Sequence, residues 1–187
     1  MTNRHPLSGI YAAALTPFKQ DFSIDLEAVN PFMHFLAAHD CHGALLFGTT
    51  GEGPSLSSWE REAILRAANE VRITFPEFRL LAGTGTPSLD ETIALTRMAF
   101  NLGCEGVVVL PPYYYRKVSD EGLFAWFDEV IRRSVPEDGY LLGYHIPAQS
   151  GVSLSIDLLA RLKDAHPRQF AGLKDSSGDP EYAVALG

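Results

Sequence analysis

Six short apolar segments recur along the chain at nearly even intervals, and this recurrence constrains the fold more than any other feature. Their starts lie 34, 36, 27, 34 and 30 residues apart. Near-continuous apolar runs of this kind are typical of strands that are buried on both faces of a parallel sheet. The predicted strands are Gly9–Leu15, Gly43–Phe47, Arg79–Ala82, Gly106–Leu110, Tyr140–Tyr144 and Phe170–Leu173.

The segments between these strands have the periodicity of amphipathic helices. Ser57 and Glu60 have the spacing of a capping box ahead of an apolar stripe that begins at Ile64. Asp179 followed by Pro180 predicts the start of another helix. The other helices are indicated by stripes at residues 26–36, 123–131 and 158–162 and by a start signal at residues 88–91. The chain therefore consists of six predicted strand–helix units.

Two architectures fit such units: a doubly wound open sheet and a (β/α)8 barrel. The even spacing favours the barrel, but eight units need roughly 250 residues and this chain has 187. We therefore predict an α/β fold of the TIM-barrel type, truncated to about six βα units and forming one partial domain over residues 1–187. The open sheet stays the alternative.

The composition argues against several classes of partner. The net charge of −8 and the pI of about 5.2 leave no basic footprint for nucleic acid or for an anionic membrane surface. No apolar run approaches the ~18 residues of a membrane span, and the first residues lack a signal-peptide pattern. Two cysteines are too few for a disulfide framework. We expect a cytoplasmic protein.

Lys174 is the most informative residue in the sequence. Of the four lysines, Lys163 lies near the end of a predicted helix, and Lys19 and Lys117 lie in polar connections. Lys174 alone follows a predicted strand, at the end where parallel α/β folds place their chemistry. Burial there disfavours the ammonium form and so supplies an amine that can attack a carbonyl. The alternatives are an ion pair with Asp175 and a phosphate anchor.

The loop Gly48-Thr49-Thr50-Gly51-Glu52-Gly53 follows the second predicted strand. It lacks the lysine of a Walker loop, and the glycines at residues 83–86 lack the third member of a dinucleotide fingerprint. Small residues with two hydroxyls at a strand end suit a carboxylate or phosphate oxyanion. A tight turn capped by its own hydroxyls is the alternative.

Aromatic, histidine and cysteine residues give weaker signals. The Tyr113–Tyr115 run is typical of interface aromatics, and Tyr144 is either a core residue or a phenol that relays protons. His145 alternates with Tyr144 and is expected to face the helices, and Cys104 is expected to be a small buried hydrophobe. His34, His39, Cys41 and His42 lack a recognised ligand spacing, so we predict no metal site there.

Four motifs in order carry a family resemblance: Gly48–Glu52, Pro112–Tyr114, Tyr144–Pro147 and Gly172–Gly178. With these motifs the chain resembles, over essentially its whole length, the dihydrodipicolinate synthase / N-acetylneuraminate lyase superfamily of class I Schiff-base aldolases. The resemblance implies a TIM-barrel catalytic domain, a small-molecule 2-oxo acid as substrate, and no metal or organic cofactor. It also implies a homo-oligomer, either a dimer or a tetramer.

The resemblance further implies a role for each matching residue. Lys174 would form an imine with the keto carbon of pyruvate or a related 2-oxo acid. Tyr144 would shuttle the proton, Thr49 would be its hydroxyl relay, and Tyr114 would complete the relay across a subunit boundary. In the loop, Thr50 would hold the substrate carboxylate together with the backbone at Gly48 and Gly51.

Gln149 departs from the pattern of one branch of the family. The synthases of the lysine pathway carry an arginine two residues after the proline at position 147, whereas this chain has Gln149. The resemblance therefore favours an aldolase with a different acceptor. The alternatives are the synthase itself, which joins pyruvate to aspartate semialdehyde, and a truncated non-catalytic remnant that only binds carboxylates or a partner subunit. A phosphate-binding open α/β protein is a third possibility.

Overall fold

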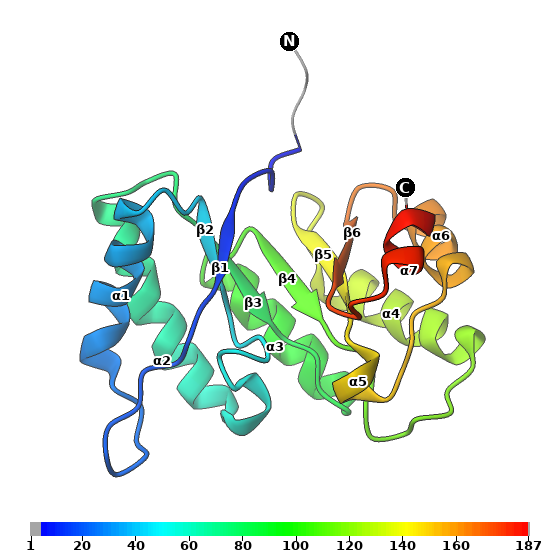
Figure 1. The fold of residues 1–187 in the computed structure, drawn as a ribbon, viewed down its shortest axis with the longest axis horizontal. Helices are drawn as coiled ribbons and strands as arrows, with labels where there is room; N and C mark the ends of the chain where they lie inside the picture. The colour runs from blue at the N-terminus through cyan, green and yellow to red at the C-terminus, as the bar shows by residue number, and fades with distance from the viewer. Residues whose placement is uncertain (1–4, 187) are drawn as a thin grey trace. The chain divides into compact units, whose positions relative to one another are not determined.

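The protein was analysed as a computed structural model that describes residues 5–186 (Figure 1). The backbone groups into two compact units. The first consists of Met1–Gly83 with Asn101–Glu105, and the second of Thr84–Phe100 with Gly106–Gly187. Each unit is a set of parallel strands connected by helices.

The first unit contains three parallel strands in chain order. Their pairing places Tyr11 opposite Gly43 and Leu45 opposite Leu81. Helices α1 and α2 pack against each other in this unit. The elements are β1 (Tyr11–Ala13), α1 (Leu26–Ala38), β2 (Gly43–Leu46), the 3-10 turn η1 (Gly53–Ser55), α2 (Ser58–Asn69), the 3-10 turn η2 (Glu70–Ile73) and β3 (Arg79–Gly83).

The second unit contains three further parallel strands, again in chain order. Its elements are α3 (Leu89–Asn101, of which Asn101 is assigned to the first unit), β4 (Gly106–Val109), α4 (Asp120–Ser134), β5 (Tyr140–His145), α5 (Pro147–Ser150), α6 (Ile156–Ala165), β6 (Phe170–Asp175) and α7 (Pro180–Ala185). A doubly wound sheet reverses its strand order at a switch point, whereas both units keep the sequence order. This topology favours the barrel.

The six predicted strands are confirmed within residues 5–186, with small differences in their bounds. β1 is shorter than the predicted Gly9–Leu15 because Gly9 adopts a φ of +151° and both Ile10 and Leu15 are exposed. β5 and β6 each continue past the predicted end into their polar residues. The polar strand ends are thus held in extended, hydrogen-bonded backbone.

Two predicted helix starts are confirmed in atomic detail. The Glu60 carboxylate accepts a 2.9 Å hydrogen bond from the Ser57 backbone N–H, and Ser57 Oγ accepts one from the Glu60 N–H. Asp179 caps α7 by accepting from the N–H groups of Glu181 and Tyr182. Residues 5–186 include no helix that is both long and apolar enough to cross a membrane.

Helix α5 was not predicted from the sequence, because a single turn of four residues shows no periodicity. It begins with Pro147 and ends where Gly151 adopts a left-handed φ of +66°. A Cβ atom at that glycine would lie 2.8 Å from Cδ of Arg116. The buried Ser150 hydroxyl donates to the carbonyls of Ile146 and Val152 and so fixes this turn at the end of β5.

Cys104 and His145 both lie where the sequence predicted. Burial raises the pKa of the Cys104 thiol to about 12, so this cysteine behaves as a small apolar side chain. The His145 ring is buried and stacks on Tyr182 of α7, with centroids 4.2 Å apart. His145 Nδ1 accepts from the Leu154 N–H at 3.1 Å, and the Tyr182 hydroxyl donates to the Leu154 carbonyl at 2.7 Å. α7 is thereby fastened to the end of β5.

Because His145 is buried as an acceptor, its protonation is expected to destabilise the second unit. Burial lowers the pKa of His145 below its ordinary 6.5, although the carboxylates of Asp175 and Asp179 oppose the shift. The unfolded chain then binds this proton at a higher pH than the folded chain does. The free energy of unfolding should therefore fall as the pH drops below about 6.5. Denaturant titrations across this range should show a flatter pH dependence in His145→Asn; equal slopes would contradict the assignment.

Candidate active site

Lys174 and Tyr144 meet at the carboxyl ends of two neighbouring strands. They are paired residues in the ladder between β5 and β6. The Lys174 Nζ atom lies 3.6 Å from the centroid of the Tyr144 ring and donates to Ser176 Oγ at 3.1 Å. Tyr144 is 4% exposed and Lys174 is half-buried, so the amine is reachable while the phenol ring is held by the core.

An irregularity in β6 produces this pairing. Leu141 is opposite Phe170, but Leu142 is opposite Gly172, so Ala171 is an extra residue on β6. Gly172 adopts a φ of +149°, which explains the glycine in the motif. If Ala171 instead paired with Leu142 in an uninterrupted ladder, Leu173 would lie opposite Tyr144. The bulge therefore places the lysine beside the tyrosine.

The contact between Lys174 and Tyr144 is a cation–π interaction. An ammonium group over the face of a phenol is attracted by about 0.5–2 kcal/mol, depending on its exposure. Nucleophilic attack on a carbonyl carbon needs an amine in its neutral form, which requires a group that can take up a proton. A phenol beside the amine is suited to exchange that proton.

The loop after β2 is held in a strained conformation. Phe47 is buried and adopts a φ of +60°, and Glu52 adopts a φ of +53°. Both are non-glycine residues in the left-handed region, a conformation that costs energy and persists only where the surrounding structure enforces it. Thr49 and Thr50 are exposed at the tip of the loop. Backbone strain of this kind clusters at ligand sites.

Two glycines let the chain close tightly around the Phe47 carbonyl. A Cβ atom at Gly53 would lie 2.1 Å from the Phe47 oxygen, and one at Gly83 would lie 2.3 Å from it. The loop is also tied at its tip, because the Thr16 hydroxyl donates to the Gly51 carbonyl at 2.6 Å. The loop between Gly48 and Gly53 is thus tightly packed and held by hydrogen bonds.

The remaining residues predicted for the site lie on other loops of the second unit. Tyr114 is 74% exposed after β4, and its ring meets that of Tyr115 edge-on at 5.1 Å. Gln149 is exposed on α5, after β5. Of the predicted site residues in the second unit, Lys174 and Tyr144 are the pair in contact. One loop of the first unit carries the predicted residues Gly48, Thr49, Thr50 and Gly51.

Two residues that contact Lys174 or the Gly48–Gly53 loop were not predicted from the sequence. Ser176 accepts from Lys174, and its position two residues later in the motif gave no separate signal. Arg61 is 5% exposed in α2 and donates to backbone carbonyls around the Gly48–Gly53 loop. Arg61 lies three residues before Ile64 and four before Leu65. Extending the apolar stripe of α2 back by one turn would have placed Arg61 on the buried face of the helix.

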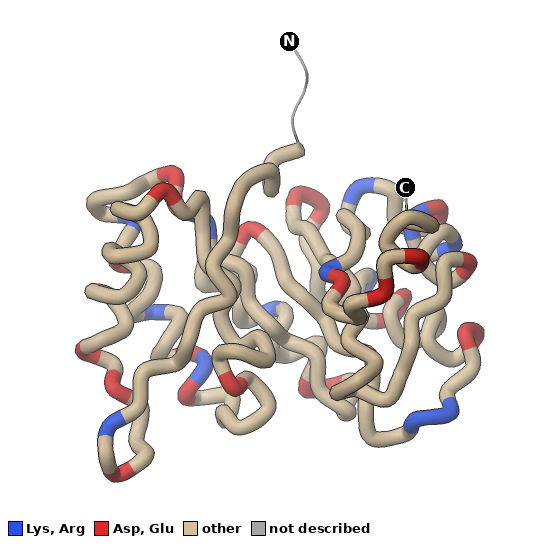
Figure 2. The backbone as a smooth tube through the Cα atoms, in the orientation of Figure 1, with Lys and Arg blue, Asp and Glu red and all other residues tan. Residues whose placement is uncertain are grey.

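Histidines and acidic residues do not form a metal centre in residues 5–186, where no group of three or more metal-ligating side chains converges. His34 meets the Phe75 ring edge-on at 5.6 Å, and His39 packs on Phe35 at 4.1 Å. Figure 2 shows basic and acidic residues interspersed along the helices and loops. Several of them form surface ion pairs, including Arg161 with Glu121.

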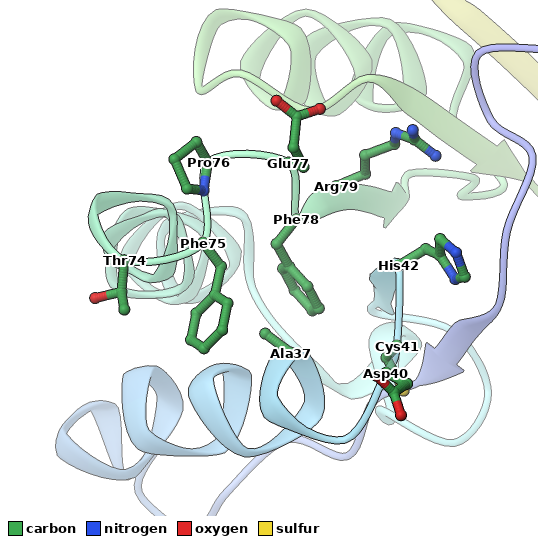
Figure 3. Close-up of a pocket in the computed structure, with 10 residues that line it drawn as sticks. All are labelled: Ala37, Asp40, Cys41, His42, Thr74, Phe75, Pro76, Glu77, Phe78 and Arg79. Atoms are coloured by element: carbon green, nitrogen blue, oxygen red, sulfur yellow. The ribbon is translucent and has the colours of Figure 1, made fainter.

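A pocket of about 470 Å³ lies in the first unit, beside the segments that lead into β2 and β3 (Figure 3). The rings of Phe75 and Phe78 lie near Ala37 of α1 in this view. The polar groups in its wall already hold the segment before β1: Arg79 donates to the Ser8 carbonyl, and His42 Nδ1 accepts from the Ile10 N–H. We assign it no ligand, and it lies at the strand ends opposite to the Gly48–Gly53 loop.

Comparisons with known proteins agree with this geometry. The sequence model of the Dihydrodipicolinate synthetase family matches residues 6–186. A protein named as an uncharacterized DapA-like lyase, from Chloroflexus aurantiacus, is 40% identical over 179 residues, which are 95% of this chain and 58% of that protein.

Two solved structures show the same fold. Dihydrodipicolinate synthase from Agrobacterium tumefaciens superposes with a TM-score of 0.88 and 37% identity, covering 95% of this chain and 61% of that one. YagE from E. coli K12, a protein of the dihydrodipicolinic acid synthase family in complex with pyruvate, superposes with a TM-score of 0.87 and 29% identity, covering 96% of this chain and 58% of that one.

These matches confirm the predicted fold class, a TIM-barrel type represented by six βα units, and they exclude the open doubly wound sheet. The chain spans 58% of the Chloroflexus protein and 61% of the Agrobacterium structure. The family match covers nearly every described residue and includes all four motifs. The chain belongs to the dihydrodipicolinate synthetase family.

Proposed function

We propose that the protein is a Schiff-base lyase or aldolase acting on pyruvate or a related 2-oxo acid. The observation that carries this proposal is the pairing of Lys174 with Tyr144, which places Nζ 3.6 Å from the phenol ring at the strand ends. Family membership supports it, as does the structural likeness to YagE, which was solved with pyruvate. The enzyme class, the substrate and the assembly below are parts of this proposal.

Lys174 supplies the nucleophile of the proposed reaction. Its neutral amine attacks the keto carbon of the 2-oxo acid, and water leaves as the carbon–nitrogen double bond of the imine forms. The protonated imine then withdraws electrons from the neighbouring carbon. That carbon loses a proton to give the enamine, which forms or releases the bond to the acceptor carbon. Tyr144 exchanges the protons in these steps, with Thr49 as its hydroxyl relay.

The Gly48–Gly53 loop supplies the binding site for the substrate carboxylate in this proposal. Thr50 offers an exposed hydroxyl beside the backbone of Gly48 and Gly51. Convergent N–H and hydroxyl donors are the chemistry that recognises a carboxylate. The strained and glycine-packed conformation of the loop supports this role, since a preformed site binds without a further ordering cost.

The exposure of Tyr114 supports the proposal that the protein works as a homo-oligomer. Its ring and that of Tyr115 are 74% and 70% exposed, and they form an edge-on aromatic pair on the loop after β4. Exposed tyrosines in contact with each other are typical of a protein interface. We propose that Tyr114 completes the proton relay of a neighbouring subunit. The single catalytic domain over residues 1–187 and the cytoplasmic location stay predictions.

The reaction of Lys174 can be tested by borohydride trapping. Pyruvate and borohydride should convert the folded chain to a stable adduct whose mass and peptide map place it on Lys174. Lys174→Ala and Lys174→Arg should give no adduct, because a guanidinium stays protonated and is not nucleophilic. Lys117→Ala, at an exposed loop position, is the matched control and should react like the wild type.

Two results would contradict the proposed reaction. An adduct that persists in Lys174→Ala would move the chemistry to another amine. Folded wild-type protein that gives no adduct would favour the non-catalytic remnant that binds carboxylates or a partner subunit. Circular dichroism of each variant shows whether it is folded.

Gln149 argues for a neutral acceptor. Its amide can hydrogen-bond hydroxyl or carbonyl groups, but it supplies no charge to compensate a carboxylate as a bidentate arginine does. Aspartate semialdehyde should therefore be a poor acceptor, and Gln149→Arg should raise its kcat/KM relative to a neutral hydroxyaldehyde by about tenfold, the effect of one charge-assisted pair. Efficient condensation of aspartate semialdehyde by the wild type would restore the synthase as the function.

A further inference from the structure

Arg61 connects three parts of the first unit. Its guanidinium donates from Nε to the Leu56 carbonyl at 3.3 Å, from Nη1 to the Gly83 carbonyl at 3.1 Å, and from Nη2 to the Gly53 carbonyl at 2.5 Å. These carbonyls belong to the turn η1, to the residue after it and to the end of β3. One side chain therefore ties the Gly48–Gly53 loop to the neighbouring strand.

The contacts of Arg61 reach the strained part of the loop. The guanidinium carbon lies 5.8 Å from the centroid of the Phe47 ring, the residue with a φ of +60°. The Gly53 residue that accepts from Arg61 donates its own N–H to the Gly48 carbonyl at 3.2 Å. That bond closes the loop across Thr49 and Thr50. Arg61 thus holds both ends of the conformation that presents the two hydroxyls.

Arg61 also brings a permanent positive charge into the interior. The residue is 5% exposed, and a guanidinium stays protonated in proteins. Burying such a charge is costly unless its donors are satisfied, and here the planar fork meets three carbonyl oxygens. A lysine in this position would carry the charge but could not reproduce the fork. The charge lies inside the hydrogen-bonded network of the loop and favours an anion bound there.

We propose that Arg61 is a positioning residue that makes the Gly48–Gly53 loop selective for carboxylate-bearing carbonyl compounds. The inference rests on the proposed function, in which this loop binds the carboxylate and Lys174 forms the imine. Arg61 acts through the loop backbone and its charge and does not touch the reacting atoms. Its removal should weaken the binding of the anionic substrate and leave the chemistry at Lys174 unchanged.

The test compares pyruvate with hydroxyacetone, a ketone of similar shape that has a hydroxymethyl group in place of the carboxylate. For each compound, borohydride trapping over a concentration series gives the half-saturating concentration and the maximal rate. In Arg61→Gln, the half-saturating concentration of pyruvate should rise by about tenfold or more, as expected for losing a charge-assisted network. The value for hydroxyacetone should stay within about twofold of the wild type.

Two further variants sharpen this comparison. Arg61→Lys keeps the charge without the fork and should lie between the wild type and Arg61→Gln for pyruvate. Arg66→Gln is the matched control, because Arg66 lies on the same helix with an exposed side chain paired to Glu62, and it should change neither compound. Should Arg61→Gln fail to fold, Arg61→Lys carries the test.

The outcomes separate this inference from the proposed function. Equal weakening of both carbonyl compounds would reduce Arg61 to a purely structural role and overturn the inference, and so would unchanged pyruvate trapping. In both cases the Schiff-base function would stand. Wild-type protein that traps neither compound would instead refute the proposed function, and the inference would fall with it.

Discussion

Parallel pairing of the strands is the constraint on which the rest of the structure depends. A parallel neighbour can be reached only through a crossover connection, so each strand is followed by a helix that returns the chain. Within a unit, the carboxyl ends of the strands then lie at the same edge. Tyr144 and Lys174 become neighbours for this reason, and so do the loop after β2 and the end of β3 at Gly83.

Much of this arrangement could be predicted from the sequence because its causes are local. An apolar run buried on both faces is visible as a strand, and a serine three residues before a glutamate is visible as a helix start, as Ser57 and Glu60 show. Lys174 was singled out because it is the one lysine of four that follows a predicted strand. These signals depend on a few adjacent residues, and tertiary packing did not override them.

The features that the sequence did not predict depend on distant contacts. The left-handed conformation of Phe47 exists because Gly53 and Gly83 both make room for its carbonyl oxygen. The buried Arg61 guanidinium is surrounded by two carbonyls from the turn at η1 and one from the end of β3, whereas an arginine in a helix is ordinarily solvated. Each of these depends on residues brought together only by the fold. The sequence around Phe47 therefore does not indicate its conformation, and the helical stripe around Arg61 indicates a buried position but not the carbonyls that surround it.

The bulge in β6 has a consequence for how relatives of this protein diverge. Five residues of β6, Phe170–Lys174, lie opposite four residues of β5, Leu141–Tyr144, so one residue can be lost from this stretch and leave Lys174 opposite Tyr144 in a regular ladder. A second deletion has no extra residue to absorb it, so it would shift the register and turn the amine to the opposite side of the sheet. The number of residues gained or lost in this short stretch therefore decides whether the lysine stays beside the tyrosine.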